Sequence, residues 1–231
     1  SEPALDQFQL SIPTASFFGL LGPNGAGKTT AISIITGLLP PDSGRVTVLG
    51  FDLKNEKATI QQKIGFVPQD LAIYEKLTGY ENLKFFARLY GLSGSLLDER
   101  ISECHEFTRL ADRASRLVSS YSGGMKRRLN LAAAMLHDPK ILFLDEPTVG
   151  IDAQSRQLIH ERLTELNLSG TTIIYTTHYM EEAQDLCSHV AIIDKGKIIQ
   201  EGTTENLTSG QGYADLNELF FTITGKQLRD E

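Results

Sequence analysis

The chain has 231 residues, 41% of them hydrophobic and 22% charged, so it can bury the core of one large domain or two small ones. The formal net charge of -7 gives no overall attraction to nucleic acid or anionic lipid and disfavours both as partners. The two cysteines, Cys104 and Cys187, fit no metal-binding spacing and favour a reducing, cytoplasmic compartment.

Apolar, β-branched or aromatic runs recur along the chain and predict β-strands. Several runs lack strict alternation of apolar and polar residues, as is typical of strands buried on both faces of a parallel sheet. The predicted strands lie at 16–21, 45–50, 63–68, 141–145, 171–177 and 189–194. After the last of them, Lys195 and Gly196 indicate the turn of a short hairpin.

Helical patterns fill most of the gaps between these strands. The predicted helices lie at 29–38, 79–90, 96–110, 124–136, 153–167 and 180–187. Strands that alternate with helices predict an α/β fold with a mostly parallel sheet. The longest uncharged stretch, residues 7–27, is broken by prolines and glycines and predicts no membrane-spanning helix.

These patterns predict a single domain over residues 1–231, without internal repeats or low-complexity runs. We expect its core at 1–70 and 121–205, including a small antiparallel β region. The stretch 71–120 has helical and loop patterns but no convincing strand, which indicates an inserted helical subdomain. A helical tail is expected at 206–231.

A phosphate-binding motif follows the first predicted strand and opens the first predicted helix. The stretch "GPNGAGKTT" matches G-x-x-x-x-G-K-[ST] in the context that the motif requires, which predicts a P-loop NTPase core. Backbone N–H groups and the helix N-terminus would surround the phosphates, with Lys28 on the β- and γ-phosphates and Thr29 on Mg²⁺. The predicted ATP-binding residues here are Gly22, Pro23, Asn24, Gly25, Ala26, Gly27, Lys28, Thr29 and Thr30.

An acidic pair ends the apolar run "ILFLDEP". A carboxylate at the carboxyl end of a parallel strand faces the ligand crevice of such sheets. Asp145 is therefore a candidate Walker-B acid that organises Mg²⁺, and Glu146 is a candidate general base for the attacking water. Taken alone, the pair could equally be an acidic strand end.

The stretch "SSYSGGM" precedes a segment of strong helix formers. Ser122 could be a helix N-cap, with Gly123 and Gly124 as turn residues. The same hydroxyl, N–H groups and positive helix end could also bind an anion.

In this order, the motifs resemble the nucleotide-binding subunit of ATP-binding cassette (ABC) transporters, and the resemblance covers essentially the whole chain. It implies that Ser122, Gly123 and Gly124 form the signature element, which contacts ATP held by the opposite subunit of a head-to-tail dimer. It also implies a Q-loop residue at Gln69 that contacts the metal and water, a D-loop over 149–152 that ends in Asp152, and a switch histidine at His178.

The resemblance implies further properties. Mg²⁺, bound with ATP through Thr29, Gln69 and Asp145, is the expected cofactor. The expected partners are a second cassette, in a homodimer or heterodimer, and an integral membrane permease, with the helical segment 71–120 as the docking surface. The subunit is expected in the cytoplasm, peripheral on the cytoplasmic face of the cell membrane. The sequence looks like that of exporter-type cassettes for drugs, lipids or polysaccharides.

The chain departs from the family pattern at three places. Tyr121 and Met125 stand where the commonest signature has leucine and glutamine. The aromatic residue that normally stacks on adenine is expected upstream of Ser1.

Two other classes of protein are possible. A soluble cassette ATPase acting on DNA or ribosomes usually has a long coiled-coil insertion or two cassettes. Here the only basic cluster is Lys126, Arg127 and Arg128, which is more typical of a solvated helix face than of a nucleic-acid site, so no nucleic acid is expected. A P-loop kinase would not explain the Ser-Gly-Gly triplet or His178.

Overall fold

The computed structural model describes residues 3–225, so the ends of the predicted core and tail, 1–2 and 226–231, lie outside it. Within the described stretch, a six-stranded sheet has the order β4-β5-β6-β1-β7-β8, and its first five strands run parallel. β8 is antiparallel to β7, and β2 and β3 form a separate antiparallel pair. The strands are β1 (Phe17–Leu21), β2 (Thr47–Val48), β3 (Phe51–Asp52), β4 (Ile64–Val67), β5 (Ile141–Asp145), β6 (Thr172–Thr177), β7 (His189–Asp194) and β8 (Lys197–Thr203).

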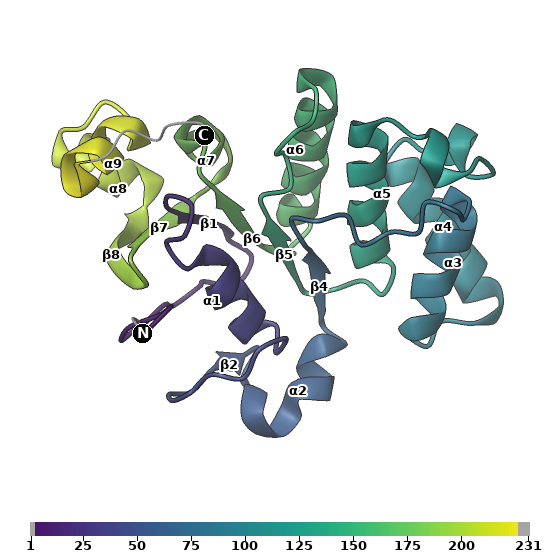
Figure 1. Ribbon diagram of the computed structural model, residues 1–231, viewed down its shortest axis with the longest axis horizontal. Helices are drawn as coiled ribbons and strands as arrows, with labels where there is room; N and C mark the ends of the chain where they lie inside the picture. Colours follow the sequence, from purple (N-terminus) through teal and green to yellow (C-terminus); the bar gives the residue numbers. More distant parts are fainter. Residues whose placement is uncertain (1–2, 226–231) are drawn as a thin grey trace.

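Helices cover both faces of the sheet (Figure 1). α1 and α2 lie on one side, α5, α6 and α7 on the other, and α3 and α4 lie beyond α5. No helix in the described part of the chain is long and apolar enough to cross a membrane. The helices are α1 (Lys28–Ile35), α2 (Leu53–Gln61), α3 (Gly79–Leu89), α4 (Gly94–Phe107), α5 (Gly123–Met135), α6 (Ala153–Leu168), α7 (Met180–Leu186), α8 (Thr204–Leu207) and α9 (Leu216–Thr224), with 3₁₀ turns at Ala111–Arg113, Val118–Ser120 and Ser209–Gln211.

β5 shows why the central strands read as continuous apolar runs. Successive side chains point to opposite faces of a sheet. Ile141 and Phe143 pack with the cluster on the α1 and α2 side, whereas Leu142 and Leu144 pack with the larger cluster on the α5, α6 and α7 side. Because both faces are covered, every position of the strand is apolar until Asp145.

The segment around 45–61 differs from the prediction. The expected strand at 45–50 is the two-residue β2, because Leu49 and Gly50 turn the chain with φ values of 52° and 83°. β3 follows and supplies the antiparallel pairing. α2 was missed: Asp52 caps it by accepting hydrogen bonds from two backbone N–H groups, and few of its residues are buried.

The parallel strands bring distant residues to one edge of the sheet. β1 leads into the phosphate loop, β4 into Gln69, β5 ends at Asp145, and β6 ends one residue before His178. The carboxyl ends of neighbouring parallel strands lie at the same edge, where ligands bind in open α/β sheets. The predicted hairpin turn is present between β7 and β8, with φ values of 48° at Lys195 and 75° at Gly196.

Candidate active site

The loop between β1 and α1 approaches its neighbours too closely for side chains at two positions. A Cβ atom at Gly22 would lie 2.3 Å from the carbonyl oxygen of Ile193. Gly27 precedes α1 with a φ of 112°, a conformation that favours glycine. The loop therefore enters α1 through a tight turn, the arrangement in which backbone N–H groups and the helix N-terminus bind phosphate.

Lys28 begins α1 and is 5% exposed. Its Nζ atom donates to the carbonyl oxygens of Gly22, at 2.8 Å, and Pro23, at 3.2 Å. It also lies 3.2 Å from Oε1 of Glu146. The other predicted phosphate-binding residues lie in the same loop or in the first turn of α1: Asn24, Gly25, Ala26, Gly27, Thr29 and Thr30.

The acidic pair at the end of β5 is buried. Asp145 is 1% exposed, and its Oδ1 accepts a hydrogen bond of 2.6 Å from the hydroxyl of Thr176 on β6. Glu146 is 6% exposed and adopts a φ of 48°, which is uncommon for a residue with a side chain. Its backbone N–H donates to the Thr176 hydroxyl at 3.0 Å. Thr176 therefore fixes both acidic residues.

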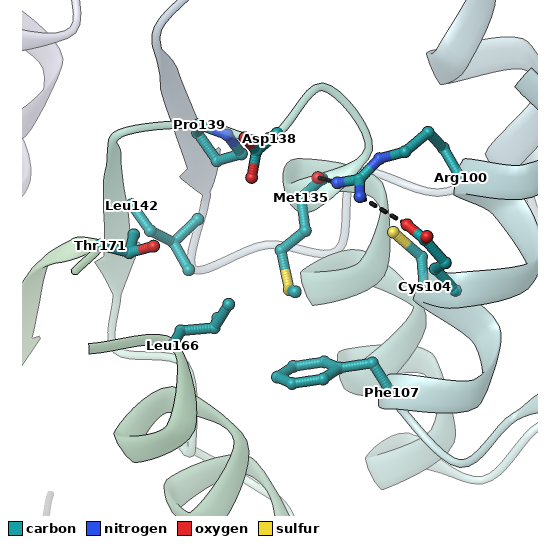
Figure 2. A pocket seen from close by; sticks show the side chains of 10 residues that line it. Arg100, Cys104, Phe107, Met135, Asp138, Pro139, Leu142, Leu166 and Thr171 are labelled. Atoms are coloured by element: carbon teal, nitrogen blue, oxygen red, sulfur yellow. Dashed lines mark hydrogen bonds and ion pairs between the residues drawn. The ribbon is translucent and has the colours of Figure 1, made fainter. Parts of the chain in front are cut away.

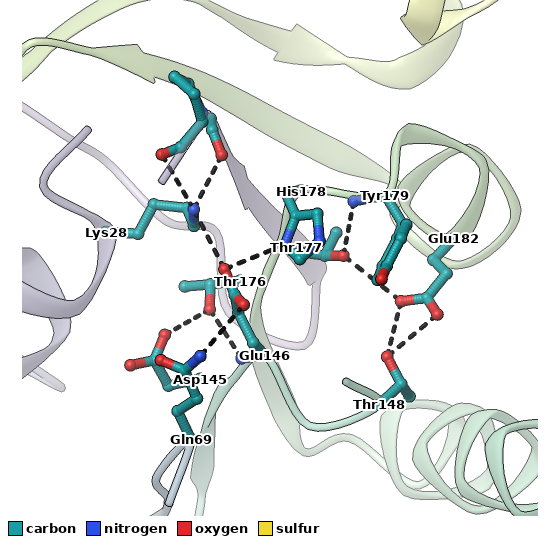
Figure 3. A network of polar contacts seen from close by, with 12 residues as sticks. Lys28, Gln69, Asp145, Glu146, Thr148, Thr176, Thr177, His178, Tyr179 and Glu182 are labelled. Carbon is teal, nitrogen blue, oxygen red and sulfur yellow. Dashed lines mark hydrogen bonds and ion pairs between the residues drawn. The ribbon is translucent and has the colours of Figure 1, made fainter. Parts of the chain in front are cut away.

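The Glu146 carboxylate is the centre of the site (Figure 3). Its Oε1 lies 3.2 Å from Nζ of Lys28 and 3.3 Å from Nδ1 of His178. Its Oε2 accepts a long contact of 3.5 Å from Nε2 of Gln69. Five predicted residues from four parts of the chain thus form one polar network: Lys28, Gln69, Asp145, Glu146 and His178.

The basic cluster on α5 is not a solvated face. Arg127 is 7% exposed and donates to the carbonyl oxygens of Pro68, at 3.1 Å, and Gln69, at 2.7 Å. Burial lowers its pKa, partly offset by Asp70. Lys126 pairs with Glu75. These side chains hold the segment around Gln69 against α5.

The signature and D-loop residues form a second group, at the amino ends of α5 and α6. The Ser122 hydroxyl accepts from the backbone N–H of Met125 at 3.2 Å and caps α5. A Cβ atom at Gly124 would lie 2.0 Å from the Ser155 hydroxyl and 3.0 Å from Oδ2 of Asp152. The backbone N–H and the hydroxyl of Ser155 donate to Asp152 and lower its pKa.

A second polar cluster, around Glu182, was not predicted from the sequence. Glu182 on α7 is 6% exposed and accepts hydrogen bonds from the hydroxyls of Thr148 and Tyr175. Figure 3 places Thr148 and Glu182 beside the turns that carry Glu146 and His178. The pair "EE" at 181–182 looks like part of an exposed helix face. Only the spacing of the apolar residues around it on α7 could have indicated that one of the two glutamates is buried.

The side-chain oxygen atoms at the strand ends and in the first turn of α1 suit Mg²⁺. They are oxygen atoms of a carboxylate at Asp145, a hydroxyl at Thr29 and an amide at Gln69, which is the chemistry that this hard cation takes. Among residues 3–225, no three or more histidine, cysteine, aspartate or glutamate side chains cluster so as to hold a metal by themselves. That arrangement fits an ion bound by one or two protein groups together with phosphate oxygens and water.

A separate cavity of about 220 Å³ lies at the other end of β5. Figure 2 shows Phe107, Met135, Leu142 and Leu166 around it, with Arg100 at one side. The Arg100 guanidinium is already bonded to main-chain carbonyl oxygens at the end of α5 and to Glu103. The cavity is therefore an apolar gap between α4, α5 and α6, away from the polar network.

The parallel sheet, the glycine-rich loop with its lysine, and the acidic end of β5 define a P-loop NTPase. Comparison with known proteins narrows the class. The ABC transporter family matches residues 5–149. The linearmycin resistance ATP-binding protein LnrL of Bacillus subtilis (strain 168) is 48% identical over 215 residues, which cover 93% of this chain and 68% of that protein. The daunorubicin/doxorubicin resistance ATP-binding protein DrrA of Streptomyces peucetius is 43% identical over 209 residues, or 90% of this chain and 63% of that protein.

Solved structures of ATP-binding cassettes also match this chain. The ATP-binding subunit of an ABC transporter superposes with a TM-score of 0.86 at 30% identity, covering 96% of this chain and 93% of that one. A dimeric ATP-binding cassette in a post-hydrolysis state, bound to ADP and Pi, has a TM-score of 0.79 at 28% identity, with coverages of 87% and 90%. The chain belongs to the ABC transporter family, and it is an ATP-hydrolysing cassette.

Proposed function

We propose that this chain is the ATP-hydrolysing subunit of an exporter, that it pairs head to tail with a second cassette around two ATP molecules, and that it drives transport through a separate membrane subunit. One observation carries the proposal. The buried Glu146 carboxylate lies within 3.5 Å of the phosphate-loop lysine, the candidate switch histidine and the Q-loop amide. A base held between these groups can activate water beside a bound γ-phosphate.

The assigned residues have separate roles in nucleotide binding and hydrolysis. The loop 22–30 binds the phosphates through its N–H groups and Lys28, and Thr29, Gln69 and Asp145 hold Mg²⁺ with the nucleotide. The ion, when bound, neutralises charge on the phosphate oxygens. Glu146 takes a proton from the attacking water, and His178, whose Nδ1 atom lies 3.3 Å from Oε1 of Glu146, steadies the geometry of the site.

The second cassette completes the site. Ser122, Gly123 and Asp152 are exposed at the amino ends of α5 and α6, where a neighbouring molecule can reach them. The positive end of α5 favours an anion there. The solved structures of related cassettes that are dimeric support pairing with a second cassette. In such a pair, Ser122, Gly123 and Gly124 would contact the ATP held by the partner.

The export role rests on the relatives and on one surface. The names of LnrL and DrrA describe resistance to linearmycin and to daunorubicin/doxorubicin, which supports export as the process. We place the membrane subunit on the helical subdomain at 71–120, where Tyr74 is 50% and Phe85 39% exposed with their rings 5.1 Å apart. The cassette then lies on the cytoplasmic face of the membrane, with its core at 1–70 and 121–205 and its tail at 206–231.

The test is phosphate release with Mg-ATP, measured over a range of protein concentrations for the wild type and for Glu146→Gln. We expect a rate per subunit that rises with concentration in the wild type and is nearly abolished in the variant, because glutamine cannot take up the proton. Equilibrium dialysis with ATP should give similar dissociation constants for the two proteins, whereas Lys28→Ala, the control, should lose binding. Normal turnover by Glu146→Gln would remove the assignment of the base.

A further inference from the structure

One buried carboxylate outside the assigned site, Glu182, has several polar partners. Glu182 on α7 accepts from the Thr148 hydroxyl at 2.9 and 3.0 Å and from the Tyr175 hydroxyl at 2.7 Å. It also lies 3.4 Å from the Thr177 hydroxyl. On the α6 side, Nε of Arg156 lies at 3.4 Å and Nε2 of His160 at 3.9 Å.

Two of the three hydroxyl partners, Thr148 and Thr177, adjoin the turns that carry Glu146 and His178 (Figure 3). Thr148 lies two residues after Glu146 and directly before the D-loop segment 149–152. Thr177 directly precedes His178, and its hydroxyl accepts the backbone N–H of Tyr179 at 2.9 Å. One side chain therefore ties the turn of the base to the turn of the histidine.

The turn at Glu146 requires such support. A residue with a side chain at φ near 48° is strained by about 1–3 kcal/mol and keeps that conformation only when its surroundings enforce it. The backbone N–H of Glu146 itself donates to the Thr176 hydroxyl. After Glu146 in the chain, the turn is fixed through the side chain of Thr148, which is 1% exposed and hydrogen-bonded to Glu182.

We propose that Glu182 is a positioning residue for ATP hydrolysis, which holds the Glu146 and His178 turns in register through the hydroxyls of Thr148 and Thr177. The inference rests on the proposed function, since it takes Glu146 as the base. A small displacement of the catalytic base lowers activity strongly. Loss of a supporting contact around a reacting centre typically lowers activity by roughly 10- to 100-fold.

The experiment compares Glu182→Gln with Glu181→Gln, a matched control, because Glu181 precedes Glu182 on α7 and is exposed. We expect Glu182→Gln to lower kcat roughly 10-fold or more while the dissociation constant for ATP changes by less than about twofold. Glu181→Gln should keep both values. A purely structural role for Glu182 would lower the melting temperature and leave kcat of the folded protein unchanged.

A second pair of variants keeps the proposal testable if Glu182→Gln fails to fold. Thr148→Val removes the hydroxyl at nearly constant volume and should lower kcat, whereas Thr148→Ser restores the hydroxyl and should recover most of the loss. Equal kcat values for Thr148→Val and wild type would overturn the proposal. If Glu146→Gln is inactive while Glu182→Gln turns over normally, only the positioning role is wrong; if Glu146→Gln turns over normally, the proposed function itself fails.

Discussion

At the scale of single residues, Tyr121 shows how a departure from the common signature is accommodated. Its side chain is 5% exposed, and its hydroxyl donates to the carbonyl oxygen of Arg113 at 2.7 Å. Burial raises the pKa of the Tyr121 hydroxyl. A Cβ atom at Gly79 would lie 2.4 Å from that hydroxyl, so the start of α3 also packs against it. Tyr121 therefore connects the signature segment to the helical region.

Replacing Tyr121 by phenylalanine should lower the free energy of unfolding by about 1 kcal/mol, because the Arg113 carbonyl loses a donor. Urea unfolding measures the change. The control is Tyr80→Phe, since the Tyr80 hydroxyl bonds to Asp98 at an exposed position where water can replace it. Equal losses in the two variants would contradict the role given to Tyr121.

The residues of the site differ in how far the sequence revealed them. Lys28, Asp145 and Glu146 stand in local motifs, so their spacing and flanking elements carried the prediction, and the structure brings them together. Thr148 and Glu182 are 34 positions apart, and neither stands in a motif that indicates the contact. Such a pairing depends on tertiary packing, which local patterns do not encode.

At the scale of elements, α5 raises the question of whether Ser122 is a cap or a ligand-binding residue. The structure has the Ser122 hydroxyl capping the helix, with Met125 as donor. The serine is nonetheless exposed, and its hydroxyl hydrogen, which the cap does not use, can donate to a phosphate oxygen. The two roles are compatible, and they respond differently to charge.

Ser122→Asp should separate these roles. Aspartate is as good an N-cap as serine, so the free energy of unfolding should stay within about 0.5 kcal/mol, whereas Ser122→Ala should lose about 1 kcal/mol. A carboxylate facing the phosphates of the partner's ATP should nearly abolish turnover in Ser122→Asp. Urea unfolding and phosphate release measure the two effects. Wild-type turnover in Ser122→Asp would mean that Ser122 only caps α5.

Elements with a continuous apolar pattern were predictable, and short polar ones were not. β5 and β6 are buried on both faces, and their observed bounds lie within one residue of the prediction. α2 has only Leu53 and Ile60 buried, so its pattern is too weak to signal a helix. β2 was expected to be longer because its sequence is β-branched, but the turn at Leu49 and Gly50 ends it.

At the scale of the whole molecule, one buried and two half-buried histidines lie in different parts of the fold. His105 is 3% exposed on α4, and its Nδ1 lies 3.0 Å from the carbonyl oxygen of Ile101. His137 stacks on Tyr90 with ring centroids 3.6 Å apart. His160 on α6 faces Glu182. Burial lowers the pKa of all three imidazoles.

This burial makes the stability of the fold depend on pH in a defined direction. Above an unfolded-state pKa of about 6.5, these histidines are neutral in both states and do not affect stability. As the pH falls below that value, the unfolded chain binds protons that the folded chain does not, so the free energy of unfolding decreases. The loss stops once the pH falls below the lowered pKa of the folded state.

His105→Gln should remove one of these contributions. Each histidine can account for at most about 1.4 kcal/mol per pH unit in this window, so the decrease in unfolding free energy between pH 7.5 and 5.5 should be smaller in His105→Gln than in the wild type. Carboxylates add a similar pH dependence to both proteins. This contribution cancels when the decrease in unfolding free energy of the variant is subtracted from that of the wild type. Identical slopes in His105→Gln and wild type would mean that His105 becomes protonated as readily in the folded protein as in the unfolded chain, although it is packed between α4 and its neighbours.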